Sequence, residues 1–264
     1  MSSRIEWCDE TCNPLGWWCF GTGTKDNPKR CKGCYAEAMA KRQLNKCDLC
    51  NSFNVPHTHF EQLEKLSKWK KPRTIFMQSM GDLFHPEVKE EWLSHVLKFC
   101  NDNPQHRYLF LTKNAKGIPL SSYIYSGHFG KHPDNFYFGI SANCQEMLQK
   151  DFKHFVNVNG NTFLSLEPLL SPIDLTRVDL GDVICDIAKG MSYSLGHGQH
   201  MPKPNWVIIG AITGREAKNH IPKKEWIEDI VTACREANVP VFLKDNLIPV
   251  TGLEYVKAHQ NYPW

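Results

Sequence analysis

Short runs of apolar residues alternate with amphipathic stretches over most of this 264-residue chain, and this alternation restricts the fold more than any other feature. A continuous apolar run of roughly four to eight residues is typical of a strand that is covered on both faces. We therefore predict strands at Arg4–Trp7, Thr74–Ser79, Arg107–Thr112, Phe136–Ser141, Thr162–Leu166, Trp206–Gly210 and Pro240–Lys244.

Apolar residues recur at helical spacing between these runs, and such stripes are usually the core faces of helices. They include Phe60 to Trp69, Trp92 to Phe99 and Trp226 to Cys234. Alternating strands and helices predict an α/β fold with a parallel sheet, and seven or eight such units in about 250 residues favour a (β/α) barrel or partial TIM-type barrel. No glycine-rich dinucleotide fingerprint follows the first strand, which disfavours a Rossmann fold.

We expect one domain over residues 1–264, with a cysteine-rich, metal-binding head at residues 1–55. Two stretches interrupt the alternation. Leu120–Asp134 is predicted to be a loop. Residues 171–204 form a long insertion without clear periodicity, and insertions of this length are typically functional lids or disordered segments.

Polar or charged residues follow nearly every predicted strand. Ligands bind at the carboxyl ends of the strands of a parallel sheet, and burying many polar groups costs free energy unless they meet a ligand or one another. This set therefore predicts a binding site, although each residue alone is equally consistent with a strand end that meets water. The residues are Ser79, Gly81, Asp82, Thr112, Lys113, Asn114, Ser141, Asn143, Glu167, Pro168, Thr213, Arg215, Lys244 and Asp245.

Seven of the eleven cysteines lie within the first fifty residues, and the other four (Cys100, Cys144, Cys185 and Cys234) are expected to be buried free thiols. Disulfide frameworks belong to short secreted chains. We see no leader and no apolar run near ~20 residues, so we expect a cytoplasmic protein that does not enter a membrane. Clustered cysteines in a reducing compartment indicate a metal centre.

The pair Cys31-x2-Cys34 allows two metal sites. Together with Cys47 and Cys50 it forms C-x2-C-x12-C-x2-C, a four-cysteine zinc pattern. With Cys19 it forms a three-thiolate set, which suits a 4Fe-4S cluster whose fourth iron is open to another ligand. The spacing alone does not choose between them.

The order of several motifs resembles the phage-associated three-cysteine-motif family, whose members are radical S-adenosylmethionine-like proteins. The matching stretches are Ile5-Glu6-Trp7, Asn13-Pro14, Cys19, Cys31-x2-Cys34-Tyr35-Ala36-Glu37, Ser79–Val88, Leu111–Lys113, Ser165–Leu170, Trp206–Gly210 and Phe242–Lys244. The resemblance implies a barrel-like fold, a 4Fe-4S cluster at Cys19, Cys31 and Cys34, and S-adenosylmethionine (SAM) that is cleaved to a 5'-deoxyadenosyl radical. The long gap between Cys19 and Cys31 departs from the C-x3-C-x2-C of most radical SAM enzymes.

The same resemblance assigns roles to residues at the strand ends. Tyr35 stands beside the cluster, and Ser79, Gly81 and Asp82 stand where the methionine amino group is held. Asp82 is alternatively a helix N-cap. Lys113 or Ser141 meets the carboxylate or ribose, and Glu167 and the Gly210 backbone contact ribose and adenine. Candidate catalytic residues are Asp82, His85, Glu167 and Lys244, although an ordinary hydrogen-bonded histidine is the favoured interpretation of His85.

Four head cysteines remain once the cluster is assigned: Cys8, Cys12, Cys47 and Cys50. They are enough for one tetrahedral site, so we hypothesise that they bind zinc or an auxiliary cluster there. A metal-dependent hydrolase is disfavoured, because hydrolases use His and carboxylate ligands and the only H-x-H pair, His57 and His59, follows Pro56 in a predicted loop.

The overall charge leaves the partner open. A net charge of +3 and a pI near 8.2 are compatible with nucleic acid without requiring it. A radical enzyme needs an electron donor, and its substrate is a nucleotide or nucleic acid, or else a small metabolite. The rival function is a zinc-stabilised nucleic-acid-binding protein without radical chemistry.

Overall fold

The computed structural model describes residues 5–31, 34–43, 45–119, 130–181, 183–194, 197–200 and 203–264. The chain divides into two compact units, Met1–Phe138 and Gly139–Trp264, which are described separately below. Seven strands form one sheet in the order β1-β2-β3-β4-β5-β10-β11, and β1 with β2, β2 with β3, β5 with β10, and β10 with β11 pair in parallel. The predicted α/β fold, a parallel sheet of the partial TIM-barrel type, is confirmed.

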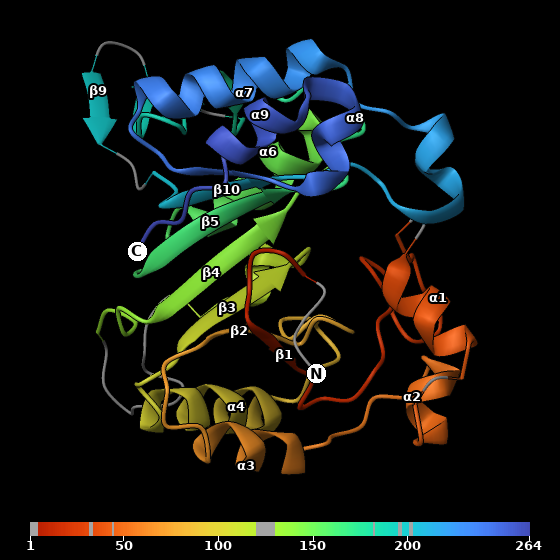
Figure 1. The fold of residues 1–264 in the computed structure, drawn as a ribbon. Coiled ribbons are helices and arrows are strands. Elements are labelled where there is room, and N and C mark those ends of the chain that lie inside the picture. The colour runs from red at the N-terminus through yellow and green to blue at the C-terminus, as the bar shows by residue number, and fades with distance from the viewer. Residues whose placement is uncertain are drawn as a thin grey trace. The chain divides into compact units, whose positions relative to one another are not determined.

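The first unit contains β1 (Glu10–Cys12), β2 (Thr74–Met77) and β3 (Arg107–Thr112), with β4 (Phe136–Ser141) beginning at its end. Helices α3 (Glu61–Ser67) and α4 (Glu90–Asp102) lie on one side of these strands (Figure 1). Both bury the apolar faces that their spacing predicts, with Leu63 and Leu66 on α3 and Val96, Leu97 and Cys100 on α4. Each fully buried leucine contributes about 1.5–3 kcal/mol to folding.

The first strand is not where the sequence predicts it. Residues 5–7 form a bend and turn, and the strand begins at Glu10. The reason is a pair of hydrogen bonds between Asp9 and Thr74. The Asp9 carboxylate accepts from the Thr74 N–H (2.7 Å), and the Asp9 N–H donates to the Thr74 carbonyl (2.9 Å). This pairing sets Glu10 opposite Ile75, while the Trp7 ring packs on Phe76 at 4.8 Å instead of entering the sheet.

Two short helices stand between β1 and α3 in the same unit. They are α1 (Tyr35–Lys41) and α2 (Asp48–Ser52), which contact each other and are drawn in orange in Figure 1. Ala36 and Ala40 of α1 pack with Phe53 and Met80 in a small apolar cluster. The chain directly after Cys34 is therefore helical and packed.

The second unit contains the strands β5 (Asn161–Leu166), β10 (Trp206–Ile209) and β11 (Val241–Leu243). Its strands are covered by the helices α6 (Gln145–Phe155), α7 (Lys224–Glu236) and α9 (Leu253–Ala258) (Figure 1). The short helix α8 (Ile248–Thr251) lies between β11 and α9 in the chain. The strands are buried almost throughout. The predicted bounds of β3 and β4 match the structure, and those of β2, β5, β10 and β11 differ by one or two residues at an end.

The insertion at residues 171–204 is more regular than predicted. Its described part forms a four-stranded antiparallel sheet of β6 (Val178–Asp179), β7 (Ile184–Asp186), β8 (Met191–Ser194) and β9 (His197–His200). These strands have only two to four residues and mix polar with apolar residues, so they lack a readable period. The predicted loop at Leu120–Asp134 falls mainly on residues 120–129, which lie outside the described residues.

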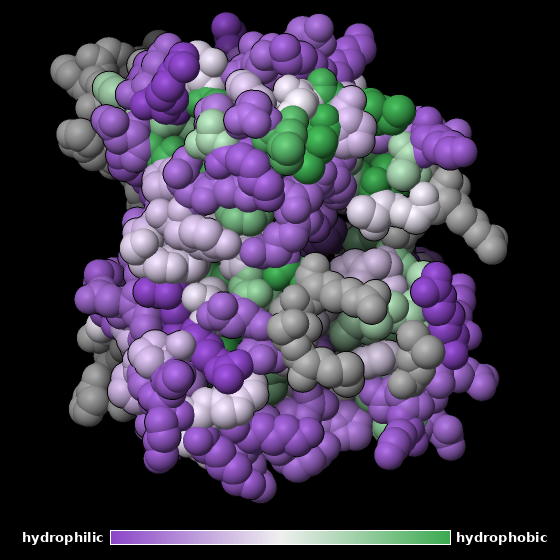
Figure 2. All heavy atoms as spheres, in the orientation of Figure 1, coloured by the Kyte–Doolittle hydropathy of each residue, from purple (hydrophilic) through white to green (hydrophobic). Residues whose placement is uncertain are grey.

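The described residues also form the 3-10 helices η1 (Ala115–Gly117), η2 (Gly214–Asn219) and η3 (Asp245–Leu247). No helix in the described part of the chain has both the length and the apolar character needed to cross a membrane. On the face shown in Figure 2, hydrophilic residues predominate and hydrophobic residues form small groups.

Candidate functional site

Two of the three predicted cluster cysteines meet at a common apolar cluster in the first unit. Cys19 follows β1 in a loop, and Cys34 precedes the first turn of α1; both pack against Ala36, Phe53 and Met80. The Gly21 N–H points at the Cys19 sulfur from 3.2 Å, and the N–H groups of Glu37 and Ala36 hydrogen-bond the Cys34 sulfur. Such N–H donors stabilise a thiolate bound to a metal cluster.

Cys31 and Cys34 are close enough to Cys19 to affect its ionisation. Burial raises the pKa of Cys19 to about 12, and Asp82, Cys31 and Cys34 add to this rise against the Gly21 N–H, which lowers the pKa. Burial also raises the pKa of Cys34, while Lys113 opposes the rise. Iron ions of a cluster would take the place of the thiol protons and stabilise the thiolates. Three cysteine thiolates, two of them with backbone N–H donors, are a ligand set that fits a 4Fe-4S group. Cys31 is the exposed member of the set.

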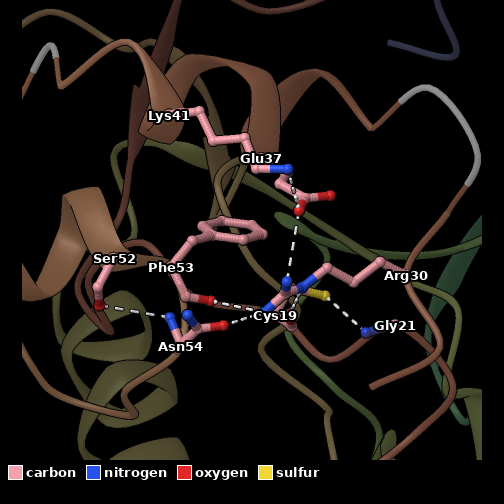
Figure 3. Close-up of polar contacts among 8 residues, drawn as sticks. All are labelled: Cys19, Gly21, Arg30, Glu37, Lys41, Ser52, Phe53 and Asn54. Atoms are coloured by element: carbon pink, nitrogen blue, oxygen red, sulfur yellow. Dashed lines mark hydrogen bonds and ion pairs between the residues drawn. The ribbon is translucent and has the colours of Figure 1, made fainter.

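Arg30 connects the cluster loop to both short helices (Figure 3). Its Nε donates to the Cys19 carbonyl (2.9 Å), and its guanidinium also donates to the Phe53 carbonyl (3.2 Å) and to Asn54 Oδ1 (2.5 Å). An ion pair to Glu37 (3.4 Å) completes the set. The planar fork of arginine suits this role, because it presents five donors in a fixed geometry.

The turn after β2 is tied to the loop before Cys19. Gln78 has a left-handed φ of +61°, and its side chain bridges the Leu15 N–H (3.0 Å) and the Gly16 carbonyl (2.6 Å). Asn13 Oδ1 accepts from the Met80 N–H at 2.8 Å. Ser79 donates to the same oxygen through its hydroxyl (3.3 Å), and its carbonyl accepts the Tyr35 hydroxyl. Predicted residues Tyr35 and Ser79 therefore lie together.

Gly81 has no room for a side chain. A Cβ there would lie 2.6 Å from the Trp18 carbonyl oxygen, next to the bridge that pairs Gly81 with Trp18. Glycine is used where two backbones approach this closely. The residue therefore permits the contact between the turn after β2 and the segment that leads to Cys19.

Asp82 is buried and accepts hydrogen bonds from both sides of the turn. Its oxygens accept from the Thr112 hydroxyl (2.7 and 2.9 Å), the Lys113 N–H (3.1 Å) and the Asn114 amide (2.7 Å). The Phe84 N–H donates to Oδ1 at 3.0 Å within a turn, and no helix begins at this point, so Asp82 is not the helix N-cap of the alternative interpretation. The predicted residues Asp82 and Lys113 are thus brought together, and the carboxylate links the ends of β2 and β3.

His85 is a buried, fully hydrogen-bonded histidine. Its Nδ1 accepts from the Glu87 N–H (3.1 Å), which leaves the proton on Nε2 for donation to the Gly23 carbonyl (3.1 Å). Its ring meets Trp18 and Phe20 edge-on. These contacts match the favoured sequence interpretation, in which His85 supports the loop after Cys19.

The second unit brings four predicted residues together at the carboxyl ends of neighbouring strands. Glu167 follows β5, Gly210 follows β10 and Lys244 follows β11. Lys244 Nζ lies 2.5 Å from Glu167 Oε1, and a Cβ on Gly210 would come within 2.9 Å of both side chains. Ser141, at the end of β4, donates to the Glu167 carbonyl at 3.3 Å.

A different group gathers four metal-ligating side chains in the first unit. The ligand atoms of Cys47, Cys50, His57 and His59 all lie within 4.8 Å of one another. Cys50 Sγ is 3.2 Å from His57 Nε2 and 3.4 Å from His59 Nε2, and Cys47 Sγ is 3.9 Å from His57 Nε2. This is the one such group in the described residues.

The other two cysteines of the hypothesised second site lie elsewhere. Cys12 is buried in β1, and burial raises its pKa to about 12. Burial also raises the pKa of Cys100 on α4, and the nearby Cys12 thiol adds to that rise. The Cys8 thiol lies 3.8 Å from the Ile5 carbonyl. Both sit outside the group formed by Cys47 and Cys50, so the structure offers a different ligand set from the four head cysteines that remain after the cluster is assigned.

A family model described as "Protein of unknown function (DUF5131)" matches residues 2–248. The chain belongs to this family. No curated protein matches it. A solved double mutant of spore photoproduct lyase with bound AdoMet and dinucleoside spore photoproduct is similar at 11% identity and a TM-score of 0.46, covering 89% of this chain and 63% of that chain. The chain therefore spans less than two thirds of that protein.

Sequence reasoning missed the two histidines in this DUF5131 member, although a signal was present. Cys47-x2-Cys50-x6-His57-x-His59 places two cysteines and two histidines within thirteen residues. Pairs of cysteines followed by pairs of histidines are a common zinc pattern. The H-x-H pair alone, after Pro56 in a predicted loop, does not indicate a hydrolase site, and only its combination with the preceding cysteine pair indicates zinc.

Proposed function

We propose that this chain is a radical SAM enzyme whose 4Fe-4S cluster is held by Cys19, Cys31 and Cys34. The observation that supports this most directly is that Cys31 and Cys34 both add to the raised pKa of Cys19, although eleven and fourteen residues separate them from it along the chain. Backbone N–H groups also point at the sulfurs of Cys19 and Cys34. A three-cysteine set leaves one iron for a second ligand, as SAM chemistry needs.

When bound, such a cluster would supply one electron to the SAM sulfonium, which would break a carbon–sulfur bond, release methionine and leave a 5'-deoxyadenosyl radical able to abstract a hydrogen atom from a substrate. The residues around it have two tasks. The apolar side chains of Phe53, Met80 and Trp17 exclude water from Cys19 and Cys34. Tyr35, the first residue of α1, ties the residue after Cys34 to the Ser79 carbonyl.

Asp82 is proposed as a positioning residue. Its carboxylate oxygens already accept four donors from the chain, so its charge fixes the Ser79–Gly81 turn against the end of β3. In this proposal the turn itself receives the methionine amino group through backbone carbonyls. Lys113, whose charge acts on the Cys34 thiol, lies on the same side and suits a carboxylate ligand.

In the second unit, Glu167 and Lys244 are proposed to meet the nucleoside part of the cofactor. A carboxylate accepts from ribose hydroxyl groups, and Gly210 leaves room for the pair at the end of β10. Ser141 supports this set through the Glu167 carbonyl. The required partner is an electron donor, and the proposed substrate class is a nucleotide or nucleic acid.

The test is to purify the protein without oxygen, measure iron and sulfide, and add dithionite and SAM. We expect about four irons per chain and formation of 5'-deoxyadenosine. Cys34→Ala should lose both, and the matched control Cys144→Ala, at the start of α6 in the other unit, should keep both. Iron without SAM cleavage, or cleavage that survives Cys34→Ala, would contradict the proposal.

The second candidate is a zinc-stabilised nucleic-acid-binding protein, which the group of Cys47, Cys50, His57 and His59 favours. It predicts a colourless protein that contains zinc but no iron and binds nucleic acid with a steep dependence on salt. The same iron measurement separates the two functions, because only the radical enzyme requires iron at Cys34.

A further inference from the structure

We propose that Cys47, Cys50, His57 and His59 bind a single zinc ion, and that this ion fixes the segment Pro14–Trp17 ahead of Cys19. The four residues come from α2, its preceding residue and the chain that enters α3, all within the first unit. No element of the proposed radical chemistry requires them. The site therefore stands on its own geometry.

The spacing of the ligand atoms fits one tetrahedral ion. Zinc binds sulfur at about 2.3 Å and nitrogen at about 2.0–2.1 Å, so tetrahedral S and N ligands lie about 3.6 Å apart. The distances from Cys50 Sγ to the two Nε2 atoms are 3.2 and 3.4 Å, and Cys47 Sγ lies 3.9 Å from His57 Nε2. All three are near the expected value.

The same distances disfavour a two-iron cluster. In a His2Cys2 two-iron centre the thiolates bind one iron and the imidazoles the other, so the cluster separates the sulfurs from the nitrogens. Here Cys50 Sγ is in direct contact with both imidazoles. Two thiolates and two imidazoles around one tetrahedral position favour zinc.

The outer partners orient both imidazoles toward the metal position. His57 Nδ1 lies 2.7 Å from the Val55 carbonyl, and His59 Nδ1 lies 2.8 Å from Glu61 Oε1. Each Nδ1 therefore carries the proton, and each Nε2 presents its lone pair to the two sulfurs. A backbone carbonyl or carboxylate behind a histidine is the usual outer partner of a metal-bound imidazole.

Three contacts connect the site to Pro14–Trp17. The His57 ring lies against Gly16, where a Cβ would come within 2.3 Å of Nε2, and the positive φ of Gly16 (+68°) also requires glycine. The His59 N–H donates to the Pro14 carbonyl at 2.7 Å, and the Trp17 N–H hydrogen-bonds the Cys50 sulfur. A bound ion would hold these three contacts in place. The last of them, at Trp17, is two residues before Cys19.

The first measurement uses the wild-type protein without iron reconstitution. We expect one zinc ion per chain, and X-ray absorption should show two sulfur and two nitrogen neighbours. Four sulfur neighbours, iron in place of zinc, or no bound metal would overturn the proposal. This measurement uses only the wild-type protein, so it decides whether zinc is bound even when a variant fails to fold.

Variants then test the ligand set. His57→Asn and His59→Asn should each lower zinc at least about tenfold, because losing a ligand costs more than losing an outer partner, which costs ~10–100-fold. Cys8→Ser and His95→Asn, the latter exposed on α4, are the matched controls and should keep zinc. Zinc that persists in both histidine variants, or is lost in Cys8→Ser, would favour another ligand set.

Hydrogen exchange tests the effect on the loop. Removing zinc with a chelator should speed exchange of the Leu15 to Trp17 amides and leave the β10 amides unchanged. Unchanged exchange at Trp17 would refute the positioning role. Cys31→Ala should keep full zinc, so failure of the radical-enzyme proposal and failure of this one give different results.

Discussion

The Glu167 carboxylate and the Lys244 ammonium lie 2.5 Å apart directly over Gly210. The pair joins the ends of β5 and β11 across β10, and it exists only because the intervening residue has no side chain. A Cβ on Gly210 would sit 2.9 Å from a carbon of each partner. A contact below 3.0 Å with two packed side chains forces at least one of them to move.

Gly210→Ala should therefore separate the ion pair and destabilise the protein by about 1–3 kcal/mol. Urea unfolding of the wild type and the variant measures this. Glu167→Ala removes one of the crowded side chains, so Gly210→Ala should cost less when it is made in the Glu167→Ala protein. An equal loss of unfolding free energy in the two proteins would show that the Glu167 side chain is not what crowds a side chain at position 210.

Asp82→Asn should cost at least about 2 kcal/mol, because hydrogen bonds to a charged group contribute about 1.5–3 kcal/mol each and an amide would oppose a donor with a donor. The matched control is Asp102→Asn on α4. Asp102 makes an exposed ion pair with Lys98, and such pairs contribute little, so this variant should stay within about 0.5 kcal/mol of wild type. Chemical denaturation of both variants compares the two carboxylates.

Arg30→Lys should loosen the loop that contains Cys19. An ammonium cannot reach the Cys19 carbonyl, the Phe53 carbonyl and Asn54 together, so we expect a loss of about 1–3 kcal/mol in unfolding free energy and lower iron loading after reconstitution. Arg42→Lys, at an exposed position after α1, should change neither. Full iron loading in Arg30→Lys would show that Arg30 is not needed to hold the cluster loop.

The pH dependence of stability should reveal Glu37. The hydrogen bond from Lys41 lowers its pKa, and the charges of Lys41 and Arg30 reinforce this. The folded-state pKa lies below the unfolded value of about 4.3, so the ionised carboxylate stabilises the fold above that pH and loses its contribution as the pH falls through the folded-state pKa.

Glu37→Gln should accordingly be less stable than wild type near neutral pH, and the difference should shrink as the solution is acidified below pH ~4. Urea unfolding at a series of pH values checks this. Glu91→Gln, with an exposed carboxylate on α4, should show little difference at any pH. A gap that stays constant down to low pH would contradict the assignment to Glu37.

Glu61→Gln should weaken zinc binding by ~10–100-fold without removing a ligand, because the carboxylate behind His59 raises its basicity and holds its ring. Competition with a chromogenic chelator gives the affinity. Glu64→Gln, one turn further along α3 and exposed, is the matched control and should bind zinc as the wild type does. Equal affinities would argue that His59 is not a zinc ligand.

Strands whose residues are nearly all apolar were predicted to within a residue or two. β3 and β4 are examples, because strands covered on both faces need no partner to be recognised. The predicted position of β1 was wrong because Glu10 and Thr11 are polar. Its actual position depends on the hydrogen bonds between Asp9 and Thr74, which are 65 residues apart in the chain. The strands of the insertion are too short to show a period.

The metal ligands show the same division. The composition of the head already shows that it is rich in soft ligands, and the order of residues shows that polar side chains end the parallel strands. Spacing does not reveal that Cys12 faces the core beside Cys100, whereas His57 and His59 turn toward Cys50. These partners follow from the three-dimensional fold, because side-chain direction depends on strand register and loop closure, which long-range contacts set.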